Sequence, residues 1–355
     1  MKKLRVGTGV SRIGCGVLLF GMALLFGAAI ARAQDSSDEL NLAWEPGSHV
    51  TAEAYTVYHH ARAANTPAGR SLRAKELASA QAPKKNAAAS AGGILQFPGD
   101  VTYQGGPVVD FAQFHAIYLL PNGKCPIATC WGDPEGFLQD LGKSYFIHLA
   151  DQYIGFFGSD RYTVGERANV SYKPPNVPLT DADVEFVVHL VASALADTGY
   201  RHIYHVFLPP GQDQCFTSAD TECYSPDNPN TFFYCGYHSS VDFSDIGHVL
   251  YTVEPYQNVS GCSLPPGTPN GMLVDSTNSV LSHESFETIT DPDGDAWFNT
   301  SQLLMFGEEI GDECEFVTFV GGNTYFNPPI FRIHGTWYSV QSEYSNSVHA
   351  CGTEP

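Results

Sequence analysis

Residues 279–295 read SVLSHESFETITDPDGD and combine a helical pattern with an unusual group of ionisable side chains. Apolar residues flank the polar ones, so we expect a helix over residues 274–289 that ends before Pro292. On such a helix His283 and Glu287 are four residues apart and project from the same face, one turn apart. This spacing allows the two side chains to bind one metal ion.

The residue that follows the histidine completes a known type of pattern. Glu284 lies at the edge of the same helix face, where its carboxylate can reach a water molecule at the metal without being a ligand. The segment is the HExxH pattern of zinc peptidases with Glu287 in place of the second histidine. We therefore predict a zinc site in which Glu284 is the general base. The alternative interpretation is a solvated helix face on which these side chains contact only water.

A third ligand must come from another part of the chain. Residues 308–314 read EEIGDEC, and a glycine-containing acidic turn beside a disulfide-bonded cysteine presents carboxylates at a fixed place. We predict Glu309 and Asp312 as the ligands from this turn. Near the end of the chain, four residues fit the lining of a groove and equally fit strand positions that face water or the core: His334, Trp337, Gln341 and Glu343.

Alternate carboxylates after the predicted helix form a rival cation site. Asp291, Asp293 and Asp295 offer oxygen ligands, which calcium prefers. The glycine of this loop falls too early for an EF-hand, so that motif is not met. A polar turn after a helix explains Asp293 and Asp295 equally well.

The remaining pattern predicts an α/β or α+β fold. We expect one mixed-sheet, disulfide-bonded domain over residues 94–355, with a zincin-like arrangement in which the late helix carries the motif. Thr180, followed by acidic residues, is the expected N-cap of a second helix that ends near Ala196. A further helical pattern covers residues 137–153. The expected strands are residues 115–120, 202–208, 231–237 and 247–253.

The N-terminal 93 residues differ from the rest of the chain. Residues 1–33 have a basic front, an apolar run from Cys15 to Ile30 and a small-residue cleavage site, which is typical of a signal peptide. A retained anchor is the alternative, but the apolar run is shorter than the roughly 20 residues that span a bilayer. Residues 34–93 contain few large apolar side chains and are predicted to be a flexible Ala-rich leader or linker.

Charge and cysteine content indicate an exported protein without a polyanionic partner. Residues 1–33 contain five basic residues and no acidic ones, so their removal changes the net charge from −20 to −25. Such a chain lacks the clustered Lys and Arg that bind nucleic acid, and it has no attraction to anionic lipid. Eight cysteines remain, and an even number in an exported protein predicts about four disulfides. Proximity suggests the pairs Cys125–Cys130 and Cys215–Cys223.

Four segments in the same order resemble the phosphate-induced protein, or Exordium-like, family. They are YQGGPVV at 103–109, CGYH at 235–238, SHESFETITDP at 282–292 and EIGDEC at 309–314. The resemblance covers residues 100–345. It implies a secreted protein of the extracellular space, periplasm or cell wall, and it implies that His283, Glu284, Glu287, Glu309 and Asp312 act as a group.

Two functions from different classes fit these patterns. The first is a secreted metal-dependent hydrolase that is similar to a peptidase, with zinc as cofactor and a peptide as substrate. The second is a non-catalytic extracellular protein that binds a cell-wall glycan or another partner and holds a structural metal. Calcium at the 291–295 loop is a third interpretation.

Overall fold

The computed structural model describes residues 39–48, 50, 52–53, 100–155, 158–219, 222–300, 308–315 and 328–355. These residues belong to one compact unit that extends from Ser37 to Pro355. The predicted signal peptide and most of the predicted leader lie outside the described residues. Within the described ranges, no helix has both the length and the apolar character needed to cross a bilayer.

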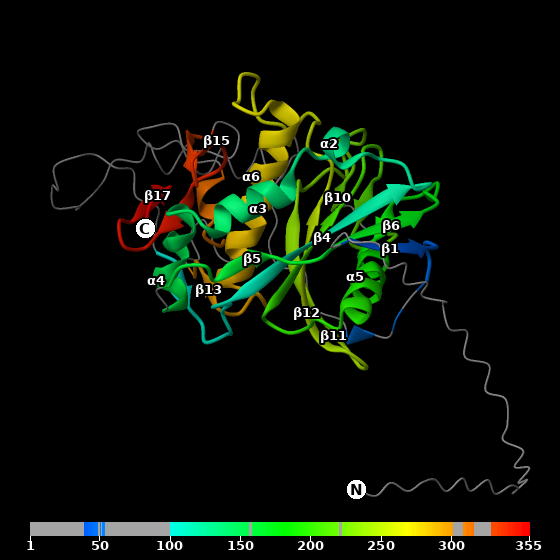
Figure 1. Cartoon of the computed structure of the whole chain (residues 1–355), viewed down its shortest axis with the longest axis horizontal. Coiled ribbons are helices and arrows are strands. Elements are labelled where there is room, and N and C mark those ends of the chain that lie inside the picture. Colours follow the sequence, from blue (N-terminus) through cyan, green and yellow to red (C-terminus); the bar gives the residue numbers. More distant parts are fainter. Residues whose placement is uncertain are drawn as a thin grey trace, which may run out of the picture. The chain divides into compact units, whose positions relative to one another are not determined.

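An eight-stranded mixed sheet organises the fold, in the order β1-β6-β4-β8-β12-β11-β2, with β5 paired to β4 (Figure 1). Neighbours from β1 to β12 are parallel, as are β4 and β5, whereas β11 is antiparallel to β12 and β2. The mixed-sheet prediction is confirmed. The strands of this sheet are β1 (Glu39–Trp44), β2 (Ala52–Glu53), β4 (Ala112–Pro121), β5 (Tyr162–Val164), β6 (Arg167–Tyr172), β8 (His202–Phe207), β11 (Tyr237–Phe243) and β12 (Gly247–Glu254).

The sheet begins earlier in the chain than the predicted domain boundary at Ile94, because β1 falls within the predicted leader at residues 34–93.

Short ladders and helices complete the fold. Short ladders are formed by β3 (Thr102–Tyr103), β7 (Leu179–Thr180), β9 (Gln214–Cys215), β10 (Cys223–Tyr224), β13 (Trp297–Phe298), β14 (Ile330–Ile333), β15 (Thr336–Ser339), β16 (Glu343–Ser345) and β17 (Ala350–Gly352). The helices are α2 (Ile127–Cys130), α3 (Pro134–Gly142), η1 (Phe146–Ala150), α4 (Asp151–Ile154), α5 (Asp181–Leu195), α6 (Met272–Thr290) and η2 (Asp312–Cys314).

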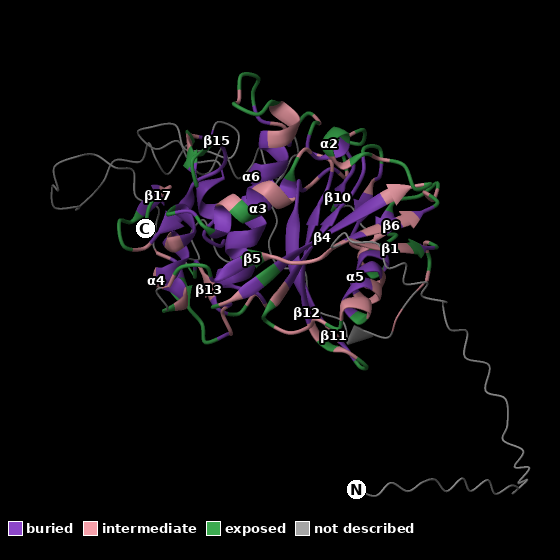
Figure 2. Cartoon of the chain, in the orientation of Figure 1, coloured by how far each residue is buried: buried purple, intermediate pink, exposed green. Residues whose placement is uncertain are grey.

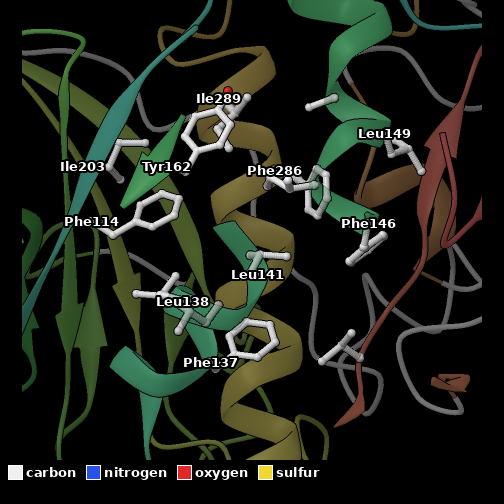
Figure 3. Packing of buried hydrophobic residues seen from close by; sticks show 14 of the residues in the cluster. Phe114, Phe137, Leu138, Leu141, Phe146, Leu149, Tyr162, Ile203, Phe286 and Ile289 are labelled. Carbon is white, nitrogen blue, oxygen red and sulfur yellow. The ribbon is translucent and has the colours of Figure 1, made fainter. Parts of the chain in front are cut away.

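Successive side chains of a strand point to opposite faces of the sheet, so the sheet has an apolar core on each face. Helices cover both of these faces. Along β4, Phe114 and Tyr118 pack in one core and Ile117 and Leu119 in the other. The first core receives α3 and α6, and Figure 3 shows their apolar side chains beside Phe114 and other residues of the sheet. The second core receives α5. The helix with the predicted motif therefore lies against one face of the sheet.

The second predicted helix, α5, begins where its sequence predicts. The Thr180 side chain accepts a hydrogen bond from the Asp183 backbone, and the Asp183 carboxylate accepts one from the Thr180 backbone. This reciprocal capping box satisfies two backbone donors that the first helical turn leaves open. At the other end, the cap residue Ala196 has a left-handed conformation with φ 62°, so the helix ends at Leu195, four residues before Gly199.

The motif helix α6 is polar and yet buried along nearly its whole length. From Asp275 to Thr290 every residue is buried, including the serines, threonines and acids (Figure 2). A buried helix is normally apolar on all sides. Burying hydroxyl and carboxyl groups is costly unless they are paired. Some of these groups have partners within the helix itself, such as the Ser285 and Thr288 hydroxyls, which donate to backbone carbonyls four residues earlier.

The structure divides one predicted helical region and contradicts one predicted strand. The helical pattern at 137–153 is not one helix, because α3 ends at Gly142 and η1 and α4 follow separately. A Cβ at Gly142 would lie 2.2 Å from the Tyr162 carbonyl, so this glycine allows the chain to turn close against β5. The predicted strand at 231–237 is an irregular segment with isolated bridges at Phe232 and Tyr234, and β11 begins only at Tyr237.

Four disulfides link all eight cysteines that follow residue 100. Cys125–Cys130 and Cys215–Cys223 confirm the two predicted pairs. Cys235–Cys262 and Cys314–Cys351 join segments that are 27 and 37 residues apart in the sequence. Such a set is typical of proteins in an oxidising, extracellular environment. The disulfide-bonded character of the domain is thus confirmed.

Candidate metal centre

His283 and Glu287 meet on α6 as their spacing predicts. Both side chains are fully buried, and Nε2 of His283 lies 3.1 Å from Oε2 of Glu287. The alternative of a solvated helix face is wrong, because neither side chain is exposed. The two residues therefore offer one nitrogen and one oxygen at a distance that suits a shared cation.

The acidic turn at η2 brings Asp312 to this pair. Oδ1 of Asp312 is 3.8 Å from Nε2 of His283, and the Asp312 backbone N–H donates to Oε1 of Glu287 at 3.0 Å. The turn can approach this closely because position 311 is glycine. A Cβ at Gly311 would lie 2.6 Å from Nδ1 of His283 and 2.8 Å from Oε1 of Glu287. The Cys314–Cys351 disulfide fixes the far side of the turn.

Glu309, the other predicted ligand of the turn, occupies a different position. Its backbone N–H donates to Oδ2 of Asp312 at 3.3 Å, and its Oε1 lies 3.8 Å from Nε2 of His238. Among the described residues, the groups with metal-ligand spacing include Asp312 but not Glu309. Glu309 therefore supports the turn and faces the second imidazole of the cluster.

The sequence did not single out His238 as a site residue, although its CGYH segment is one of the four motifs. His238 projects from β11 toward α6, with Nδ1 3.5 Å from Oε2 of Glu284 and 3.6 Å from Oε2 of Glu287. Gly236 allows this approach, because a Cβ there would lie 2.6 Å from Val280 Cγ1. The pairing of a distant strand with α6 carries no local signal in the sequence.

Gln341 fixes the tautomer of His283. Its Nε2 donates to the carbonyl of Gly311, which can only accept, so its Oε1 faces Nδ1 of His283 at 3.3 Å. Nδ1 must then carry a proton, and the Nε2 lone pair of a neutral His283 points at Glu287 and Asp312. A lone pair that faces two carboxylates is repulsive unless a proton or a metal ion lies between them. Metal-bound histidines are typically held in this way through their other ring nitrogen.

Glu343 of β16 adds another carboxylate to the cluster. It is fully buried, and neither of its oxygens has a hydrogen-bond partner in the part of the chain that the structure describes. Burial raises the pKa of Glu343 well above its usual value, and the neighbouring Glu287 and Glu284 charges raise it further, although His283 lowers it. A buried carboxyl group without partners is a costly feature that a bound cation would offset.

The carboxyl groups of the cluster outnumber its imidazoles. The cluster contains the imidazoles of His238 and His283 and six buried carboxyl groups. These are Glu284, Glu287, Asp291, Glu309, Asp312 and Glu343. Among the described residues the sole buried Lys or Arg is Arg161, which binds Asp151. Buried charges are tolerated when they are paired or bind metals, so the cluster has the composition of a cation site.

The pKa values of the cluster show the same conflict of charges. Burial lowers the pKa of His283, but Glu287 and Glu284 outweigh it and raise the pKa well above its usual value. Burial likewise lowers the pKa of His238, whereas hydrogen bonds with Glu284 and Glu287 raise it to about 10. For Glu284 burial dominates and raises the pKa to about 8. For Glu287 the two imidazoles outweigh burial and lower the pKa.

Two overlapping groups have the spacing of metal ligands. His283, Glu287 and Asp312 form one, and His238, Glu284 and Glu287 form the other, with one ligand atom from each residue within 4.8 Å of the others. Two ligands at ~2.1 Å from a tetrahedral zinc ion are about 3.4 Å apart. The measured separations of 3.1 and 3.8 Å in the first group bracket this value. Within the described residues, no such group contains both imidazoles.

The rival calcium loop is not assembled. Asp291 Oδ1 accepts a hydrogen bond from the Ala296 backbone at 2.6 Å. Asp293 instead pairs with Nε2 of His248 at 3.1 Å and accepts a hydrogen bond from the Tyr200 hydroxyl at 2.6 Å. In the described part of the chain, no ligand-spaced group includes any aspartate of this loop. The polar turn is therefore the better description of residues 291–295.

Comparisons with other proteins add nothing to the identity of this centre. No protein-family model, no curated protein and no solved structure matches the chain. The resemblance to the Exordium-like family therefore stays a prediction that depends on the four sequence motifs.

Proposed function

We propose that this chain is a metal-dependent hydrolase of peptide bonds, with zinc held by His283, Glu287 and Asp312. The observation that carries the proposal is the buried group of His283, Glu287 and Asp312, in which one ligand atom from each residue lies within 4.8 Å of the others. Zinc fits this donor set better than calcium, since calcium prefers an all-oxygen shell and here one donor is an imidazole nitrogen.

Glu284 is the proposed general base. When bound, zinc supplies a Lewis acid that lowers the pKa of a nearby water molecule. Glu284 follows His283 directly on α6, and its Oε2 lies 3.5 Å from Nδ1 of His238. Its pKa of about 8 lies close to neutrality, where a carboxylate can both accept and return a proton. In this proposal His238 orients the Glu284 carboxylate.

The proposed zincin-like arrangement has support from the position of α6. This helix lies on one face of a mixed sheet, next to the antiparallel strand β11. Its His283 and Glu287 are one turn apart, as in the HExxH pattern. Secretion and membership of the Exordium-like family are proposed on the same footing, from the signal-peptide pattern and the four motifs, and the disulfides support an oxidising environment.

A second function is favoured by the burial of the centre. His238, His283, Glu284, Glu287 and Asp312 are at most 1% exposed. A substrate must reach a catalytic metal, whereas a structural metal is normally enclosed. We therefore retain the alternative of a non-catalytic extracellular protein, one that binds a partner or a cell-wall glycan and is stabilised by a buried metal.

One substitution separates the two functions. We expect Glu284→Gln to retain bound zinc and to lose at least about 100-fold in cleavage of labelled protein substrates, because it removes only the base. Glu185→Gln, the same chemical change on α5, is the matched control and should leave cleavage unchanged. If the wild-type protein binds zinc and cleaves no peptide bond, while chelation lowers its melting temperature, the structural-metal alternative is correct.

A further inference from the structure

A second histidine cluster lies on the sheet face opposite α6. His115 of β4 and His202 of β8 approach each other with Nε2 of His115 3.1 Å from Nδ1 of His202. Asp197 follows the end of α5 and places Oδ1 3.8 Å from Nε2 of His202. One ligand atom from each of the three residues lies within 4.8 Å of the others. None of these residues belongs to the centre on α6.

The orientation of His115 is fixed by its surroundings. Its Nδ1 lies 2.9 Å from the carbonyl of Glu166, which can only accept, so Nδ1 carries the proton and Nε2 carries the lone pair. The ring stacks on Tyr204 at 4.9 Å, and a Cβ at Gly165 would lie 2.4 Å from its Cε1. This is the arrangement of a metal-binding histidine whose other nitrogen donates to a backbone carbonyl.

His115 can only accept a hydrogen bond at Nε2, so the single proton of a neutral His202 cannot serve both His115 and Asp197. If Nδ1 of His202 donates to His115, the Nε2 lone pair of a neutral His202 faces the Asp197 carboxylate. A cation can contact one ligand atom from each of the three residues, with a single ring nitrogen of His202 directed at it.

We propose that His115, His202 and Asp197 bind a divalent transition-metal ion, zinc, at a second site. The 3.1 Å between the two ring nitrogens is close to the about 3.4 Å expected for two ligands of a tetrahedral zinc ion. Asp197 lies two residues beyond Leu195, the last residue of α5.

The site keeps room for solvent. His202 and Asp197 are partly exposed, and His202 also lines a cavity of about 300 Å³ beside Arg201 and Gln113. Water can therefore complete the coordination shell. The ion joins β4, β8 and the end of α5, so its binding stabilises the contact between that helix and the sheet.

Metal stoichiometry and thermal unfolding test this site. The full chain, freed of metal with a chelator, is titrated with zinc and compared with His202→Gln and Asp197→Asn, which alter partly exposed side chains. His189→Gln is the matched control, because His189 of α5 pairs with Asp245 between β11 and β12 and belongs to no ligand group among the described residues. We expect His202→Gln to bind one zinc ion fewer than wild type and Asp197→Asn to bind at least about 10-fold more weakly at this site.

The outcomes distinguish the two metal sites. If His202→Gln and His189→Gln both bind as much zinc as wild type, with the same zinc-dependent rise in melting temperature, the second site does not exist. A loss of zinc in Glu287→Gln that leaves the His202-dependent zinc intact supports the second site whatever the activity of the first. If wild type binds zinc in a way that depends on His202, and Glu287→Gln binds as much zinc as wild type, the proposed function is overturned and this inference is unaffected.

Discussion

At the scale of single residues, Gln341 and Gly311 determine how His283 is presented. Gln341 holds Nδ1, and Gly311 leaves space for the turn that carries Asp312. Neither residue is a proposed ligand. Both act by placing a ligand, and substitutions of such supporting residues change metal affinity rather than metal identity.

Replacing Gln341 with methionine tests the tautomer argument. The variant keeps the volume of the side chain but loses the acceptor at Nδ1, so His283 no longer holds its proton there. We expect zinc affinity to fall about 10- to 100-fold, with little change in the fold. Competition with a chromophoric chelator measures the affinity. Unchanged affinity would show that Gln341 does not set the orientation of the imidazole.

Gly311→Ala tests the close approach of the turn. A Cβ at this position would lie 2.6 Å from Nδ1 of His283, so we expect zinc binding to be lost and the free energy of unfolding to fall by about 1–3 kcal/mol. Gly352→Ala is the control, because its nearest neighbour would be 3.8 Å away. Urea unfolding with and without zinc measures both effects, and equal results for the two variants would contradict the account.

At the scale of elements, the sequence predicts which site residues lie on one helix or turn, but not which separate elements contact each other. The i, i+4 pair on α6 and the acidic turn at η2 follow from local spacing, and the structure brings Asp312 to that pair. His238 is contributed by β11 and Gln341 by the segment before β16, and their approach depends on the order of strands. Local patterns carry no information on that order.

The burial of α6 is the largest departure from the pattern at this scale. A helix with so many serines, threonines and acids would by composition lie at the surface. Some of its polar groups have interior partners, for example the Ser279 hydroxyl, which accepts a hydrogen bond from the Gln341 backbone at 3.0 Å. Failures of pattern reasoning of this kind are expected at functional sites.

His248 links two elements in a pH-dependent way. It lies between Asp242 of β11, at 2.8 Å, and Asp293 after α6, at 3.1 Å. Burial lowers the pKa of His248, but its hydrogen bonds with Asp293 and Asp242 outweigh it and raise the pKa above the usual value. A raised pKa in the folded state means that the stabilisation is complete below the unfolded pKa of about 6.5 and is lost as the pH rises through the folded pKa.

His248→Gln should therefore destabilise the protein at pH 5.5 more than at pH 9. The difference is on the order of 1 kcal/mol, since the partly exposed pair is screened by solvent. Urea unfolding at the two pH values measures it, with His349→Gln, another histidine paired with an aspartate, as the control. An equal loss at both pH values would mean that His248 contributes no charge-dependent stability.

At the scale of the whole molecule, the interior contains more acid than its own basic groups can neutralise. The metal-free form must protonate some carboxyl groups, and burial raises the pKa values of Glu309 and Glu343 well above their usual range. A raised carboxyl pKa contributes stability that is complete below the unfolded value of about 4.3 and is lost as the pH rises through the folded pKa. We expect the metal-free protein to lose stability from pH 5 to pH 8.

Metal should remove this dependence. With zinc bound, the carboxylates have a permanent counter-charge, so the melting temperature should vary much less between pH 5 and pH 8 and should exceed that of the metal-free form throughout. Calorimetry with and without a chelator across this range provides the comparison. Identical curves for both samples would indicate that the interior is neutralised by protons alone.

The most direct measurement is anomalous diffraction at the zinc edge from crystals of protein purified without chelator. The account predicts a peak about 2.0–2.2 Å from Nε2 of His283 and from carboxylate oxygens of Glu287 and Asp312. Absence of a peak at these three side chains, in crystals where their positions are clear, would contradict the metal centre and with it the proposed hydrolase.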